Sequence, residues 1–259
     1  DRDNSVRSEA LSLLPKSTID PDKAVDLYAD IIKRGSVREA QAALTGLGEL
    51  KTAKAEGLLS DLLAQMETGK LRAPIHLDLI EALEVQTESA AIATKLAAYE
   101  AKLLETDDLG LFVAAIEGGD PRAGYGVFYW NSTAQCTRCH AIFEVGGNVG
   151  PNLSGVGARL SPRELLTSVI RPSAALALGH ETVLVTLADE EMLSGIVLER
   201  TPSELKLKIG KSETRTIPQA DIAEVETLPS SMPSIEGKLS RKEIRDLVAF
   251  LVAEKGESH

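Results

Sequence analysis

The hydrophobic pattern of this 259-residue chain changes its period near His180, and that change limits the folds it can adopt. Before it, apolar residues recur three and four positions apart, as on the buried face of a helix. Helix-start signals divide this part, with a proline after Asp20 and capping boxes that begin at Ser36 and Ser161. From His180 on, apolar and polar residues alternate, as in "ELKLKIG" at 204–210, which predicts strands with one buried face. We therefore expect a mainly α protein with a small β insertion.

Residues 1–119 are rich in alanine and leucine and predict a series of short helices. Part of the apolar pattern recurs about 36 residues later, the length of a two-helix solenoid repeat. The recurring residues are Val37, Ala43 and Leu47, followed by Ala73, Leu79 and Leu83. The pattern favours a HEAT-like repeat region over 1–119, and an irregular helical bundle is the alternative.

Three further segments follow. Residues 120–179 hold both cysteines, residues 180–228 form the β insertion, and residues 229–259 contain a loop and a C-terminal helix that begins at Ser240. Four or five short antiparallel strands in about 50 residues are enough for a small antiparallel β-barrel.

Charge and hydropathy exclude some partners. The net charge of −11 argues against nucleic acid and against an anionic membrane surface. No apolar run reaches the roughly 18 residues of a transmembrane helix. The abrupt start at Asp1 inside a helical pattern suggests a fragment of a longer chain.

The two cysteines stand close together in "STAQCTRCHAIF", as Cys136 and Cys139, with His140 directly after them. A redox dithiol, half of a zinc site and covalent haem attachment all use a Cys-x-x-Cys pair. A zinc site needs a second ligand pair, which the chain lacks, and a dithiol gains nothing from the histidine. Attachment of one c-type haem explains all three residues, with two thioethers and His140 on the iron. Dithiol and metal chemistry remain the alternatives.

The three methionines and the three other histidines are the candidates for a second iron ligand. Met66 and Met192 lie in helical and strand patterns and are expected in the core. Met232 lies in "LPSSMPSIEG", a loop without periodicity, which favours it as the thioether ligand. An exposed loop methionine is the alternative.

The order of these motifs resembles a class I cytochrome c, and more closely the haem-binding domain of the planctomycete–verrucomicrobium type. In that family a β segment interrupts the cytochrome core, and HEAT-like repeats often precede it. The resemblance covers about 120–255 and rests on four stretches: "GVFYWNSTAQCTRCHAI", "GGNVGPNLSGVGARLSPRELLTSVIRPSA", "ETVLVTLADEEMLSGIV" and "SSMPSIEGKLSRKEIRDLVAFL".

The resemblance implies roles for further residues. The carbonyl of Pro151 would accept a hydrogen bond from His140, and Gly124 would allow two helices to approach closely. Arg159 would be a partner for a haem propionate, and a surface arginine beside a helix is the alternative. One departure is His180, where the family commonly has an aromatic residue; it is either a surface substitution or a competing ligand.

These expectations describe an electron-transfer module rather than an enzyme by itself. One covalent haem would have His140 and Met232 as ligands and accept electrons from a redox partner protein or a fused dehydrogenase domain. A haem enzyme or gas-binding sensor with an open sixth position, and an interaction module, are the alternatives. Because such haems are attached outside the cytoplasm, a periplasmic or otherwise exported location is expected.

Overall fold

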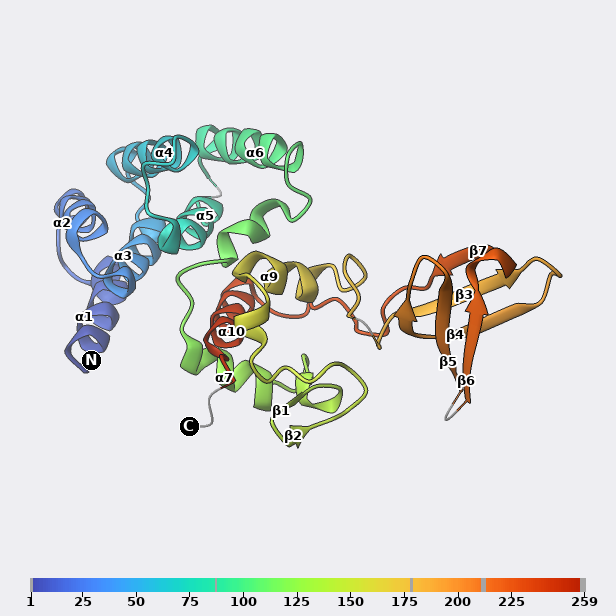
Figure 1. Ribbon diagram of the computed structural model, residues 1–259. Coiled ribbons are helices and arrows are strands. Elements are labelled where there is room, and N and C mark those ends of the chain that lie inside the picture. Colours follow the sequence, from blue (N-terminus) through green and yellow to red (C-terminus); the bar gives the residue numbers. More distant parts are fainter. Residues whose placement is uncertain (1, 87, 178, 211–212, 257–259) are drawn as a thin grey trace. The chain divides into compact units, whose positions relative to one another are not determined.

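The computed structural model describes residues 2–86, 88–177, 179–210 and 213–256. The chain divides into two compact units (Figure 1). The helical unit comprises Asp1–Tyr125 and Ser240–Phe250, and the cysteine unit comprises Gly126–Leu239 and Leu251–His259. Two helices, α7 (Pro121–Trp130) and α10 (Arg241–Ala253), contribute residues to both units.

The helical unit is built from helix pairs that stack on one another. Helix α3 packs against α1 and α5, and α4 packs against α2 and α6, so that equivalent helices form two layers (Figure 1). This stacking accommodates the repeated apolar pattern, while membership of the HEAT class stays a prediction. The helices are α1 (Arg2–Leu13), α2 (Pro21–Arg34), α3 (Val37–Glu49), α4 (Ala53–Glu67), α5 (His76–Glu84) and α6 (Ala90–Leu104), with short 3-10 helices η1 (Leu14–Lys16), η2 (Ala73–Ile75) and η3 (Gly110–Ala115).

The expected helix starts are confirmed. The Asp20 carboxylate accepts hydrogen bonds from two backbone N–H groups of the first turn of α2. Complete capping boxes join Ser36 to Glu39 and Ser161 to Glu164. Each satisfies N–H groups that have no partner inside the helix, which explains why these boundaries are readable from sequence.

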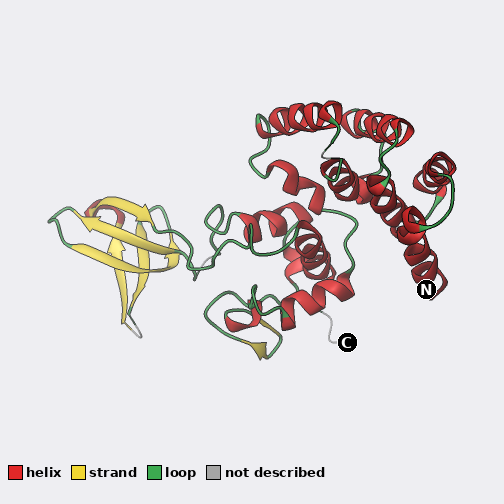
Figure 2. Cartoon of the chain, turned by 180° about the vertical axis from the view of Figure 1, so that it is seen from behind, coloured by secondary structure: helices red, strands yellow, loops and turns green. Residues whose placement is uncertain are grey.

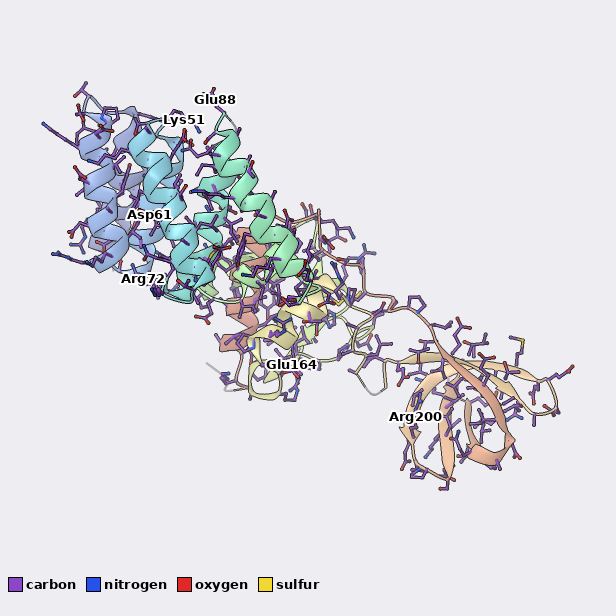
Figure 3. The ribbon with its side chains drawn as sticks, turned by 90° about the horizontal axis from the view of Figure 1, so that it is seen from above. Lys51, Asp61, Arg72, Glu88, Glu164 and Arg200 are labelled. Carbon is purple, nitrogen blue, oxygen red and sulfur yellow. The ribbon has the colours of Figure 1, made fainter. Side chains whose placement is uncertain are left out.

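Basic side chains satisfy the opposite ends of the stacked helices. Arg72 donates to the carbonyl oxygens of Ile32 (3.0 Å) and Gly35 (2.9 Å) at the end of α2. Lys51 donates to that of Val85 (2.7 Å) beyond α5. Arg72 and Lys51 lie at opposite ends of the helices (Figure 3). Both contacts bind one helix pair to the next at carbonyls that the helices leave unpaired.

The first part of α10 joins the helical unit through a buried ion pair. Arg245 of α10 lies 2.6 Å from Asp78 of α5, and their side chains are only 6% and 2% exposed. Burial raises the pKa of Asp78 above its usual value, against the opposing effect of Arg245. The two charges are thus removed from water together, and each depends on the other for compensation.

Helices α7 and α10 cross closely at Gly124. A Cβ atom at this position would lie 1.9 Å from the carbonyl oxygen of Asp246 and 2.8 Å from Cβ of Phe250. The close approach expected at Gly124 is confirmed. Tyr125 packs edge to face on Phe250, with ring centroids 5.7 Å apart.

The cysteine unit contains short elements and one larger sheet. After α7 come the 3-10 helix η4 (Cys136–Arg138), the strands β1 (Ala141–Ile142) and β2 (Val145–Gly146), and the helices α8 (Val156–Arg159) and α9 (Pro162–Ile170). The larger sheet follows, drawn in yellow in Figure 2. Its strands are β3 (Thr182–Leu187), β4 (Met192–Arg200), β5 (Glu204–Ile209), β6 (Glu213–Pro218) and β7 (Ile222–Thr227), with a short 3-10 helix η5 (Gln219–Asp221) before β7.

The expected β-barrel is wrong. The five strands form an open antiparallel sheet in the order β6-β5-β4-β3-β7, and no barrel closes in the part of the chain that the structure describes. Closure would require β6 and β7, the two edge strands, to pair with each other. An alternating sequence pattern predicts which face of a strand is buried, but it does not predict which strands pair. The inward residues still form one core, as the alternation predicts: Val183, Val185, Leu187, Val197, Leu205, Leu207 and Ile217.

The expected mainly α class is also wrong. About 52% of the structure is helical, and the five-stranded and two-stranded antiparallel sheets make it a mixed α/β fold. None of the helices in the described ranges is long and apolar enough to cross a bilayer.

Met192 is a third correction. It is 61% exposed rather than part of the core. Met192 and Leu193 are adjacent in β4, so only one of them can face the core of the sheet. Leu193 packs against that core, which leaves Met192 on the other face.

Replacing Asp78 with Asn would leave the buried Arg245 guanidinium without its anionic partner. We expect the free energy of unfolding to fall by about 3–5 kcal/mol, measured by urea denaturation. Asp61→Asn is the matched control, because Asp61 is exposed on α4 and a surface change of this kind alters stability by about 0.5 kcal/mol or less. Combining Asp78→Leu with Arg245→Met should recover most of the loss, and equal effects of Asp78→Asn and Asp61→Asn would contradict this account.

Candidate haem-attachment site

The two thiols and the imidazole share one tight turn. Helix α7 ends at Trp130, and the Asn131 side chain then accepts hydrogen bonds from the N–H groups of Thr133 (2.9 Å) and Ala134 (3.0 Å). The 3-10 helix η4 follows, in which the N–H groups of Cys139 and His140 both donate to the carbonyl oxygen of Cys136, at 3.2 and 2.9 Å. This winding brings Cys136, Cys139 and His140 onto a single turn of chain.

Both thiols are free and half-buried. Burial raises the pKa of Cys136 above its ordinary value, with a smaller contribution in the same direction from Cys139. Redox-active and metal-binding cysteines need the opposite, an environment that stabilises the thiolate. In the described residues no three His, Cys, Asp or Glu side chains gather into a group that could hold a metal ion. The pKa shift therefore does not favour a reactive thiolate at Cys136 in the metal-free chain.

A glycine-rich loop lies against the back of this turn. The N–H of Gly147 donates to the carbonyl oxygen of Thr137, and the N–H of Gly150 to that of Cys139, both at 2.8 Å. A Cβ atom at Gly147 would lie 2.2 Å from the carbonyl oxygen of Arg138. The loop and the turn therefore approach at backbone distance, which a side chain at Gly147 would prevent.

The loop also holds the imidazole. Nδ1 of His140 lies 2.9 Å from the carbonyl oxygen of Pro151, which is the hydrogen bond that the resemblance implies. Because a carbonyl oxygen only accepts, we assign the proton of this bond to Nδ1, which in the neutral ring leaves the lone pair on Nε2. This arrangement is typical of histidines that bind a metal through Nε2. A function of Pro151 in cofactor binding stays a prediction.

Arg159 is anchored to the same loop. Its guanidinium donates to the carbonyl oxygens of Ser154 (2.5 Å) and Asn152 (3.2 Å). Asn152 in turn donates through its side-chain amide to the carbonyl of Phe143. The exposed Arg159 thus fixes the segment that follows Pro151, and its expected contact with a propionate stays a prediction.

Met232 lies in a different group of contacts. Its side chain is half-buried, and its N–H donates to Oγ of Ser230 at 3.1 Å. The N–H of Ser230 donates to Oγ of Ser173, and Oγ of Ser234 donates to the carbonyl of Ile170 at the end of α9. The loop of Met232 is thus fastened to the end of α9, whereas the cysteines, His140, Pro151 and Arg159 belong to the turn and its glycine loop.

The remaining candidate ligands have other environments. Met66 is buried in α4, as expected. His180 is half-buried in the turn before β3, where its N–H donates to the carbonyl of Ala177.

Sequence reasoning overlooked two residues of the site. Asn131 forms the turn that carries the chain from α7 to the cysteines, and Gly150 contacts the ring of His140. The signal for Gly150 was present, because a loop with glycines at 146, 147 and 150 predicts a close approach of backbone.

No protein-family model matches this chain, and no curated protein compared with it gives a match. The function therefore has to be argued from the residues of the site.

Arg159→Ala would remove both hydrogen bonds to the loop carbonyls. We expect the backbone N–H groups of Gly150 and Leu153, which pair with the cysteine turn, to exchange with solvent faster, measured by amide hydrogen exchange. Arg138→Ala is the matched control, because the exposed guanidinium of Arg138 donates to the exposed side chain of Gln135 and to no loop carbonyl in the described part of the chain. Unchanged exchange at both N–H groups in Arg159→Ala would show that the loop does not depend on this arginine.

Proposed function

We propose that this chain carries one haem, bound covalently through Cys136 and Cys139, and that it transfers electrons. The observation that carries the proposal is the single turn that presents two free thiols and an imidazole whose Nδ1 is bound to the Pro151 carbonyl. A c-type haem uses two thiols for its vinyl groups and one imidazole nitrogen for its iron.

The residues present fit this cofactor. Both thiols are free, and thioether bonds to the vinyl groups of a haem require reduced cysteines. The hydrogen bond to Pro151 leaves Nε2 of His140 as the nitrogen with a lone pair. The glycine loop holds the backbone of the turn, so that these groups keep their positions relative to one another.

A bound haem supplies a one-electron couple. His140 and Met232 are the residues proposed to hold its iron, and thioether ligation together with imidazole would raise the reduction potential. The guanidinium of Arg159 has N–H donors beyond the two that bind loop carbonyls, and these are proposed for a propionate.

The proposed partner is a redox protein or a dehydrogenase domain, fused or separate, that donates electrons to the haem. Attachment of haem to such motifs outside the cytoplasm supports a periplasmic or otherwise exported location. The net charge of −11 supports partners other than nucleic acid.

Covalent attachment is tested with serine variants. We expect the wild-type chain to keep its haem through acid–acetone extraction, each single variant Cys136→Ser and Cys139→Ser to keep less, and the double variant to keep none, because one thioether is lost with each thiol. Retention is measured by the pyridine haemochrome spectrum of the extracted protein. Haem that stays attached in the double variant, or a wild-type chain that never acquires haem in a cell able to attach it, would contradict the proposal.

The second axial ligand is tested at Met232. We expect Met232→Ala to permit binding of carbon monoxide to the ferrous protein and to lower the reduction potential, because the thioether is lost. Met66→Ala should leave the spectrum unchanged but lower the free energy of unfolding by about 2–5 kcal/mol, since Met66 is buried.

Met192→Ala is the matched control for both measurements, because Met192 is exposed. If the wild-type chain already binds carbon monoxide, the assignment of Met232 is wrong. A haem enzyme or a gas-binding sensor would then replace the electron carrier.

A further inference from the structure

Gly150 packs against the ring of His140. A Cβ atom at Gly150 would lie 2.5 Å from Cε1, 2.8 Å from Nδ1 and 3.1 Å from Nε2 of His140. These three distances place such an atom over the face of the imidazole, because an atom at the edge beyond Cε1 would lie much farther from both nitrogens. Gly150 therefore approaches the ring so closely, near Cε1, that no room is left for a side chain.

The neighbouring glycines are required for different reasons. Gly146 has φ +130°, a conformation that other residues rarely adopt. At Gly147 the obstacle is the backbone carbonyl of Arg138. Gly150 has no such φ, and the atoms nearest to its missing side chain all belong to the His140 ring. The ring is thus the specific reason for a glycine at this position.

Two contacts from consecutive residues together fix the ring. The Pro151 carbonyl lies 2.9 Å from Nδ1, and Gly150 lies so close to one face of the ring that a Cβ atom would collide with it. Rotation about the Cβ–Cγ bond of a histidine is otherwise soft. A turn of the ring in one direction would press it into Gly150, and any large turn would break the hydrogen bond of Nδ1.

We infer that Gly150 is a positioning residue that sets the plane of the His140 ring and hence the direction in which Nε2 offers its lone pair to the iron. The inference rests on the proposed function. Gly150 positions the His140 ring because it has no side chain that would collide with it. Pro151 positions the ring through the hydrogen bond of its carbonyl oxygen. Neighbours of a ligating histidine that fix its orientation tune the metal site without touching the metal.

The first test is the electron paramagnetic resonance spectrum of the ferric protein, whose g values depend on ligand orientation. We expect Gly150→Ala to shift the g values or to lose the low-spin signal. Gly126→Ala is the matched control, since a Cβ there would meet only Trp130, at an ordinary 3.8 Å, and its spectrum should equal that of the wild type. Wild-type g values in Gly150→Ala would overturn the inference. A wild-type chain without any haem signal would instead refute the proposed function.

The second test does not use the haem signal and covers the case in which Gly150→Ala disturbs folding. Urea midpoints are measured for the full chain as wild type, Gly150→Ala, His140→Ala and the double variant. In the presence of the ring, we expect Gly150→Ala to lower the midpoint strongly or to prevent folding. In the His140→Ala background its effect should be much smaller. An equal loss in both backgrounds, or failure to fold in both, would mean that the alanine collides with something other than the ring and would overturn the inference.

Discussion

The backbone pairing between the cysteine turn and the glycine loop is the constraint on which the rest of the site depends. The N–H groups of residues 147, 150 and 153 donate to the carbonyls of residues 137, 139 and 141. Three loop residues therefore run beside every two residues of the turn. The loop must fold its extra length against its partner at backbone distance, and Gly147 and Gly150 are the residues that permit it. The same pairing places the Pro151 carbonyl oxygen within hydrogen-bond distance of Nδ1 of His140.

Local features were predictable from the sequence. A capping box satisfies backbone groups within four residues of chain, so the helix starts at Ser36 and Ser161 follow from their own neighbours. The alternation in 204–210 likewise predicts both β5 and its inward residues. The turn at Cys136 belongs to the same class, because its three candidate site residues lie within one short motif.

Features that depend on distant pairing were not predictable. Whether the sheet closes depends on β6 and β7, which are separated by the whole width of the sheet. The exposure of Met192 depends on which of two adjacent apolar residues faces the core. The ion pair between Asp78 and Arg245 joins residues 167 positions apart. The residues around each of them in the sequence do not predict that the two charges pair.

The electrostatics of the cysteine turn also bear on the choice among its three chemistries. A thiolate is stabilised by a helix N-terminus, a nearby cation or a metal, and a disulfide oxidoreductase or zinc site uses such stabilisation. At Cys136 the dominant effect is burial, which acts on the thiol in the opposite direction. The basic group nearest in sequence, Arg138, directs its side chain to Gln135. The turn thus does not stabilise a thiolate at Cys136. Its specific contact is the hydrogen bond between His140 and the Pro151 carbonyl. This arrangement accords with the proposed function, in which the two cysteines would hold a haem and His140 would bind its iron.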